Sequence, residues 1–346
     1  MSKASGVIVA KAKCMHGMQL DREDYKELLH KKSITEITSF LKNETTYAEA
    51  LKDVRENNIH RGQLENLLRQ DMFKKTMKLY RYAPSAEKKY YQLHLQEIEI
   101  EVLLFHIRTL ISQEFEDAIS ELPLFLKAYL SFDLVRLGMV KTYDDLLNVI
   151  KNTMYYETLN TFRVSKGKEY TIDYTAIETT LQKCYYNHVF EVIDKVIKGK
   201  KKKAVKDFFI SEVELANITK IYRFKKFFQA REDEIRESLI FIDGYLTNAF
   251  MEELIAEKSA EGVLKKLQQK RYHIVLDNNE DTYIEHSTEK ILYDIAKKNF
   301  IYSQDAPLVF TSYLLIVNRE LENITNIIEG IRYQVTSEDI EKMLIY

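Results

Sequence analysis

The sequence predicts an all-α protein built from three homologous helical-bundle domains. Only 9 Gly and 3 Pro occur in 346 residues, and so few turn formers imply few turns and long helices. Hydrophobic residues make up 45% of the chain and charged residues 30%, which allows a sizeable core beneath a solvated surface. An internal repeat at intervals of roughly 110 residues sets the number of bundles.

The repeat is clearest in two segments that share the tripeptide Asn-Ile-Thr. These are EVELANITKIYRFKKFFQ at 212–229 and ELENITNIIEGIR at 320–332, and a weaker echo, QEIEIEVLLFHIRTLI at 96–111, has Glu101-Val102 in the Asn-Ile place. Each segment has the apolar periodicity of a buried helix. The asparagines are interpreted as polar groups satisfied at a helix contact, with a partner contact as the alternative. The candidate repeat-motif or partner-contact residues are Asn217, Thr219, Arg223, Asn323, Thr325 and Arg332.

Shorter markers repeat in the same register and predict where helices begin. Leu20-Asp21 and Leu246-Thr247 each place an apolar residue before an N-cap. Ser33 and Glu36 have the spacing of a capping box for a helix expected at 34–41.

Each copy is expected to end in one long helix, which follows a penultimate helix. The last helix of each copy should start near Ala86, Ala204 and Pro307 and run about 25 residues, or roughly 40 Å. Pro307 suits a first turn because its missing N–H would be unpaired there. Segments 169–174 and 271–276 are interpreted as loops rather than strands. The predicted domains are the segments 1–117, 118–232 and 233–346.

Charge and cysteine usage narrow the class of protein. The net charge is −2 and the pI is near 6.5, so no overall field selects nucleic acid. Cys14 and Cys184 lie far apart without a ligand-like spacing, and we expect both to be reduced. The apolar run at 7–10 is too short for a secretory signal, and no stretch approaches the roughly 18–20 apolar residues of a membrane span. We therefore expect a soluble, cytosolic protein.

One basic cluster stands out in a loop between two helices of the middle copy. It is interpreted as a solvated connection, with an acidic protein surface or anionic lipid headgroups as alternative partners. The candidate contact residues are Lys200, Lys201, Lys202 and Lys203.

The chain lacks the motifs of catalysis and cofactor binding. No GxxxxGK, GxGxxG, HExxH or GxSxG occurs. Glu27 and His30 form a single ExxH, whereas a di-iron bundle needs a second one with further carboxylates. We therefore predict no enzyme, no cofactor and no metal site.

The repeated segments resemble the C subunit of the prokaryotic V-type (A/V-type) ATPase, the counterpart of the d subunit in eukaryotic vacuolar ATPases. The likeness covers essentially the whole chain. The segments that carry it are DREDYKELLHKKSITEITSFLKNETTY, ELANITKIYRFKK, IDGYLTNAFMEELIAEKS, ENITNIIEGIR and TSEDIEKMLIY.

The resemblance implies three domains arranged as a pseudo-threefold funnel on the rotor axis. It implies a non-catalytic central-stalk protein, a socket that couples the rotating shaft, formed by the D and F subunits, to the membrane proteolipid ring of c/K subunits. Torque for H⁺ or Na⁺ transport would pass through it, while ATP hydrolysis or ATP synthesis takes place in the A and B subunits. Its place would be peripheral on the cytoplasmic face of the membrane, where the cytoplasmic surface of the membrane-embedded a/I subunit is a further partner.

Two other functions compete with this one. A general helical scaffold or adaptor with no rotary role would be built from short repeats of about 34–47 residues, and the repeat here is far longer. A helical enzyme with a metal or carboxylate site would hold stoichiometric metal when purified.

Overall fold

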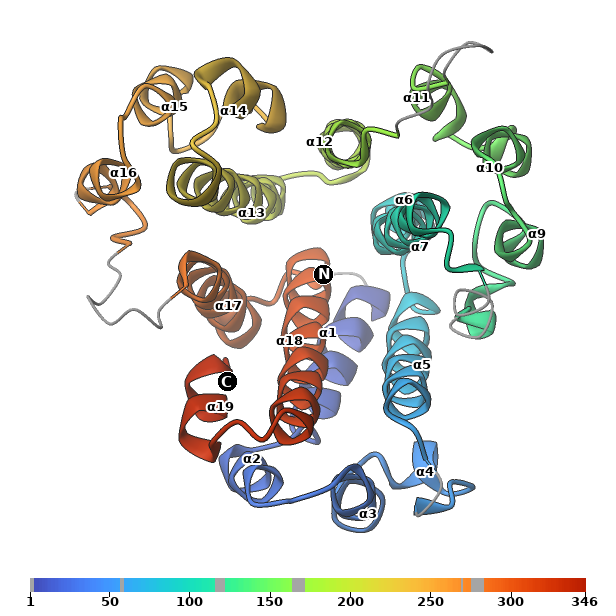
Figure 1. Cartoon of the computed structure of the whole chain (residues 1–346). Helices are drawn as coiled ribbons and strands as arrows, with labels where there is room; N and C mark the ends of the chain where they lie inside the picture. The colour runs from blue at the N-terminus through green and yellow to red at the C-terminus, as the bar shows by residue number, and fades with distance from the viewer. Residues whose placement is uncertain (1–2, 57–58, 116–121, 164–171, 269, 275–282) are drawn as a thin grey trace. The chain divides into compact units, whose positions relative to one another are not determined.

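The computed structural model describes residues 3–56, 59–115, 122–163, 172–268, 270–274 and 283–346. Within these residues all regular structure is helical and no strand occurs (Figure 1). The all-α prediction is therefore confirmed. Segments 169–174 and 271–276 lie partly outside the described residues, and their described parts contain no strand.

The chain folds into two compact units, and the first combines residues 1–85 with residues 274–346. Its helices are α1 Lys3–His16, α2 Arg22–Leu29, α3 Ile34–Glu44, α4 Ala48–Leu51, α5 Arg61–Tyr80, α17 Ile284–Tyr302, α18 Ala306–Arg332 and α19 Ser337–Met343. Helix α18 packs against α1, α5, α17 and α19. The two sequence-distant parts of this unit therefore share one helix as their centre.

The second unit comprises residues 86–273. Its helices are α6 Lys88–Tyr91, α7 Leu93–Ser112, α9 Leu134–Gly138, α10 Tyr143–Ile150, α11 Tyr156–Asn160, α12 Tyr174–Val196, α13 Lys200–Arg223, α14 Glu232–Ser238, α15 Asn248–Ile255 and α16 Ala260–Leu267. Helix α12 packs against both α7 and α13. The division into 1–117, 118–232 and 233–346 partitions the chain differently and stays a prediction.

The short helices begin at side-chain caps that the sequence predicts. The Asp21 carboxylate accepts hydrogen bonds from backbone N–H groups in the first turn of α2, and Thr247 caps α15 in the same way. Ser33 Oγ accepts from the N–H of Glu36 at 3.2 Å. The Glu36 carboxylate accepts from the N–H of Lys32 rather than from that of Ser33, so the predicted capping box is only half formed.

The starts of the long helices differ from the prediction in two of three cases. Helix α18 begins at Ala306 with Pro307 in its first turn, as expected. Helix α13 begins earlier, at Lys200, because Gly199 adopts a positive φ of 72° and ends the preceding connection there. Helix α7 begins later, at Leu93, after a 3₁₀ turn and the short helix α6.

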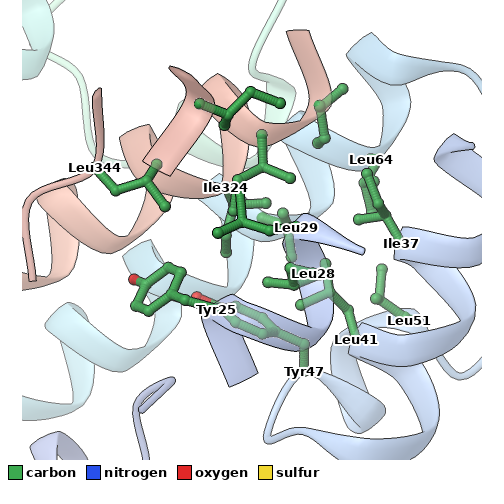
Figure 2. Close-up of a cluster of buried hydrophobic side chains, with 14 of the residues drawn as sticks. Tyr25, Leu28, Leu29, Ile37, Leu41, Tyr47, Leu51, Leu64, Ile324 and Leu344 are labelled. Carbon is green, nitrogen blue, oxygen red and sulfur yellow. The ribbon is translucent and has the colours of Figure 1, made fainter. Parts of the chain in front are cut away.

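One core cluster in the first unit joins side chains from two parts of the unit that are far apart in the sequence. Figure 2 shows residues of α2 and α3 meeting Ile324 of α18 and Leu344 beyond α19. The buried members are Tyr25, Leu28, Leu29, Ile37, Leu41, Tyr47, Leu51, Ile59, Leu64, Leu68, Ile324, Ile327, Ile328, Ile340 and Leu344. Burial of this apolar surface holds residues 25–68 against residues 324–344.

A glutamine in the left-handed conformation follows the end of each repeated long helix. These are Gln113, Gln229 and Gln334, with φ values of 62°, 48° and 57°. Fourteen positions separate Glu99 from Gln113 and Glu320 from Gln334, whereas fifteen separate Glu214 from Gln229. The extra residue coincides with a π-helical turn at Phe224–Phe228, and such a turn is how an α-helix absorbs one inserted residue.

We expect deletion of Phe227 to convert this turn to regular α-helix and to change the melting temperature by less than about 3 °C, or about 1 kcal/mol. Deletion of the exposed Ala216 in the same helix is the matched control. It would rotate Glu214 by about 100° relative to Asn217 and should destabilise the protein far more. If the two deletions lowered the melting temperature equally, this account would be contradicted.

Candidate functional site: the junctions of the long helices

A buried carboxylate on α18 joins this helix to the first residues of the fold. Glu320 is 7% exposed and accepts hydrogen bonds from the Leu20 N–H at 2.9 Å and the Tyr47 hydroxyl at 2.6 Å. Leu20 precedes the N-cap of α2, and Tyr47 follows α3. One side chain thus fixes both ends of the α2–α3 pair on α18.

The same junction occurs on α13. Glu214 is 2% exposed and accepts from the Leu246 N–H at 2.6 Å and the Tyr272 hydroxyl at 2.5 Å. Leu246 precedes the N-cap of α15. A Cβ on Gly244 would overlap Glu214 Oε1, so the chain approaches the carboxylate as closely as only glycine permits.

A third junction lies on α7. Glu99 is 4% exposed and accepts from the Tyr155 hydroxyl at 2.7 Å and from the Ser131 N–H. Ser131 lies just before Asp133, the N-cap of α9. The helices α7, α13 and α18 therefore each carry one buried carboxylate that binds a main-chain N–H and a tyrosine of the segment that follows in the repeat. For α18 that segment is residues 20–47.

The junctions correct the register of the weakest repeat by one residue. Glu99, Glu214 and Glu320 are equivalent by their contacts, and three positions further along lie Val102, Asn217 and Asn323. In the first copy Val102, and not Glu101, therefore takes the place of the asparagine. The two basic residues of the motif are not equivalent either, since Arg223 corresponds to Glu329 in this register and Arg332 lies one turn beyond.

The two asparagines each bind the main chain of a single isoleucine. The Asn217 amide donates to the Ile240 carbonyl at 2.7 Å and accepts from the Ile240 N–H at 3.1 Å. Asn323 does the same to Ile345, at 2.8 and 3.0 Å. Asn217 is 3% exposed and Asn323 1% exposed, so both amides are buried with their polar atoms bonded within the chain.

The remaining candidate residues lie outside these junctions. The Thr219 hydroxyl donates to the Leu215 carbonyl within its own helix at 3.1 Å. Thr325 is half-buried, Arg223 is exposed, and the exposed Arg332 guanidinium lies 5.4 Å from the centroid of the neighbouring Tyr333 ring. The structure therefore brings the asparagines to the junctions and leaves the two arginines on the surface.

The prediction of a basic loop is wrong for the lysine cluster, because Lys200, Lys201, Lys202 and Lys203 form the first turn of α13. Lys201 makes an ion pair with Glu87, and Lys202 pairs with Asp194 at 3.2 Å. Lys200 and Lys203 are exposed. Positive charge in a first turn is unfavourable with the helix dipole, and a partner contact by these lysines stays a prediction.

Burial sets the electrostatics of two of the junctions. It raises the pKa of the Glu320 carboxyl, although the hydrogen bonds from Tyr47 and Leu20 act in the opposite direction. The pKa of Glu214 is raised for the same reason, against the bonds from Leu246 and Tyr272. Burial also raises the pKa of the Tyr47 hydroxyl, so it remains a donor at neutral pH.

The junction groups form hydrogen bonds to one another and to the main chain, and their chemistry is that of a structural link. Among the described residues no three His, Cys, Asp or Glu side chains gather as metal ligands would. No described helix has both the length and the apolar composition needed to cross a bilayer.

A family model described as the ATP synthase (C/AC39) subunit matches residues 8–343. The chain belongs to this family. The resemblance to the C/d family of V-type ATPase subunits is thereby confirmed over nearly the whole sequence. No curated protein matched the chain in a sequence search.

In this C/AC39 protein the junction residues are not among the candidates that the sequence predicts. Tyr47, Tyr155 and Tyr272 recur at matching points of the repeat, and so do the three glutamates. An alignment of the copies that starts at Glu214 and Glu320, rather than at the Asn-Ile-Thr tripeptide, places Glu99 as the equivalent glutamate of the first copy.

We expect the substitutions Tyr47→Phe, Tyr155→Phe and Tyr272→Phe each to lower the free energy of unfolding by about 1.5–3 kcal/mol, because each removes a hydrogen bond to a buried carboxylate. Tyr302→Phe, at a residue 78% exposed, is the control and should change it by less than about 0.5 kcal/mol. Urea unfolding of the four variants measures the difference. A junction tyrosine that behaved like Tyr302 would not be a structural link.

The substitution Glu320→Gln should change how stability depends on pH. The carboxyl has a higher pKa in the folded state than its ordinary value of 4.5, so its contribution is present below that value and is lost as pH rises through the folded pKa. The unmodified protein should therefore lose stability relative to Glu320→Gln as pH rises above 4.5. A difference in unfolding free energy that stayed constant, or moved the other way, would show that the folded pKa is not raised.

Proposed function

We propose that this C/AC39 protein is a non-catalytic rotor component of a V-type ATPase. It is a socket that receives the shaft of D and F subunits, rests on the c/K proteolipid ring at the cytoplasmic face of the membrane, and transmits torque for H⁺ or Na⁺ transport. The cytoplasmic surface of the membrane-embedded a/I subunit lies within its reach in this arrangement. ATP is hydrolysed or synthesised in other parts of the complex.

The observation that carries this proposal is the repeated carboxylate–tyrosine junction. The helix that ends the first copy binds the second copy, α13 binds the third, and α18 binds the first. Three equivalent links, one on the last helix of each copy, support a protein built from three like copies that are held to one another. A general scaffold of open-ended repeats would leave its last helix without such a link.

The chemistry of the junctions also suits a protein that transmits torque. A close-packed interior resists deformation, and a buried carboxylate cannot leave its donors without a penalty of several kcal/mol in lost hydrogen bonds and desolvation. Force applied to one copy would therefore pass to the next rather than be absorbed by local rearrangement.

Native mass spectrometry of the full chain mixed with its cognate D and F subunits tests the proposal. We expect a complex of one C/AC39 chain, one D and one F at physiological salt. The control replaces D and F with an unrelated acidic helical protein at the same concentration, which should give no complex.

A folded protein that remained alone with D and F, and also failed to sediment with the proteolipid ring in detergent, would contradict the socket. That result would favour the adaptor without a rotary role. Persistence of the complex across 50–300 mM salt would separate a specific interface from charge attraction, which weakens within that range.

A further inference from the structure

Two carboxylates of the second unit lie near each other without a basic partner. Glu97 is on α7 and Glu212 on α13, and α12 packs against both of these helices (Figure 1). The two carboxylates are close enough to repel each other. Within the described ranges neither pairs with a lysine or arginine, and Glu97 instead meets the His94 ring, with 3.6 Å between Oε2 and Nδ1.

The pair occupies one equivalent position of the repeat. Glu97 and Glu212 each lie two residues before a junction glutamate, Glu99 and Glu214, and the third copy has Asn318 at this position. The third copy therefore builds its long helix with an uncharged side chain there. Because packing does not require a carboxylate at this point, and two unpaired like charges oppose folding, the charges of the pair need an explanation other than stability.

The histidine beside the pair is buried with its ring nitrogens unbonded. His94 is 8% exposed, and neither Nδ1 nor Nε2 has a hydrogen-bond partner in the described part of the chain. The contact between Nδ1 and Glu97 is too long for a hydrogen bond. Since buried polar groups are nearly always bonded, an unbonded imidazole beside a carboxylate points to a further polar group that binds here.

Tyrosines of α12 form another side of this place. The Tyr186 hydroxyl hydrogen-bonds with the Glu212 carboxylate. Tyr185 lies near both carboxylates, and its ring centroid is 5.2 Å from that of Tyr186. Carboxylates beside aromatic rings suit an organic cation, which gains charge-assisted hydrogen bonds and cation–π attraction. A metal ion is less well suited, because no three His, Cys, Asp or Glu side chains of the described residues gather as ligands.

The pair can be reached from solvent and holds a proton. The Glu97 side chain is 45% exposed, and Glu212 and Tyr186 are half-buried. The titratable groups that act on Glu212 are Glu97 of α7 and Tyr186 of α12. Loss of solvation and then repulsion by Glu97 raise the pKa of the Glu212 carboxyl from 4.5 to about 8, against the hydrogen bond with Tyr186.

We propose that Glu97 and Glu212 form a binding site for the lysine or arginine side chain of a partner protein. The cation lies between the two carboxylates, and His94, Tyr185 and Tyr186 surround it. On binding, the cation displaces the proton from Glu212, which passes to solvent. Affinity therefore rises with pH until the carboxyl is ionised in the free protein.

Titration of the full chain with n-butylammonium, a mimic of the lysine side chain, tests the site. NMR spectra of glutamate labelled with ¹³C at the side-chain carboxyl report on Glu97 and Glu212 directly. We expect saturable binding at about pH 8.5, and at least about 10-fold weaker binding at about pH 6.5, because the proton then occupies Glu212.

Matched variants assign the binding to the pair. Glu97→Gln combined with Glu212→Gln should abolish it. Glu212→Gln alone should remove most of the pH dependence while His94, of a residue type that changes charge near neutral pH, stays in place. Glu157→Gln removes one charge from an exposed glutamate of α11 and should alter neither affinity nor pH dependence.

Thermal unfolding separates a binding role from a structural one. Because the double glutamine variant loses a repulsion and has amides like that of Asn318, it should melt no lower than the unmodified protein at about pH 8.5. A clearly lower melting temperature would show that the pair is structural and would overturn the site.

Three results of the titration would also overturn the site. These are no saturable binding at about pH 8.5, equal binding by the double variant and Glu157→Gln, and a pH dependence that survives Glu212→Gln. Sodium ions that shifted the same resonances as strongly, at the same concentration, would show a site for inorganic cations instead. None of these measurements uses D, F or the ring, so failure here is distinct from failure of the socket.

Discussion

Burial of a carboxylate on each of the helices α7, α13 and α18 is the constraint on which the other contacts depend. An ionised carboxylate leaves water at a cost of several kcal/mol unless donors replace its solvation. At each junction the carboxylate accepts two hydrogen bonds. One comes from a main-chain N–H that precedes a short helix, and the other comes from a tyrosine hydroxyl that follows the next short helix. The two short helices between these donors are thereby fixed in position. In the first unit, apolar side chains of α2 and α3 pack with those of α18.

The repeat tolerates change wherever this constraint is respected. Val102 replaces the asparagine in the first copy, and the Glu99 junction persists beside it. The segment from Glu214 to Gln229 is one residue longer than its counterparts. The π-helical turn absorbs this residue beyond Asn217, so the junction side chains keep their positions on the helix surface. Variation is thus found at the asparagine position and in the turns beyond it, where it leaves the glutamate junctions in place.

The sequence predicted what local interactions determine. Caps such as Asp21 and Thr247 bind groups two or three residues away, and the scarcity of Gly and Pro reflects helix length directly, so the all-α class and the starts of these capped helices could be inferred. The Tyr47–Glu320 bond spans 273 residues and the Tyr155–Glu99 bond 56. Periodicity within one helix carries no information about such pairs, and only comparison between copies could have shown that a glutamate and a tyrosine recur together.

The two asparagine clamps repeat the same chemistry with different connectivity. At Asn217 the bound residue, Ile240, is followed within a few positions by Leu246, which Glu214 holds. At Asn323 the bound residue, Ile345, and the segment that Glu320 holds are remote in sequence. The same side-chain contacts therefore fix a local loop in one unit and join distant parts of the chain in the other.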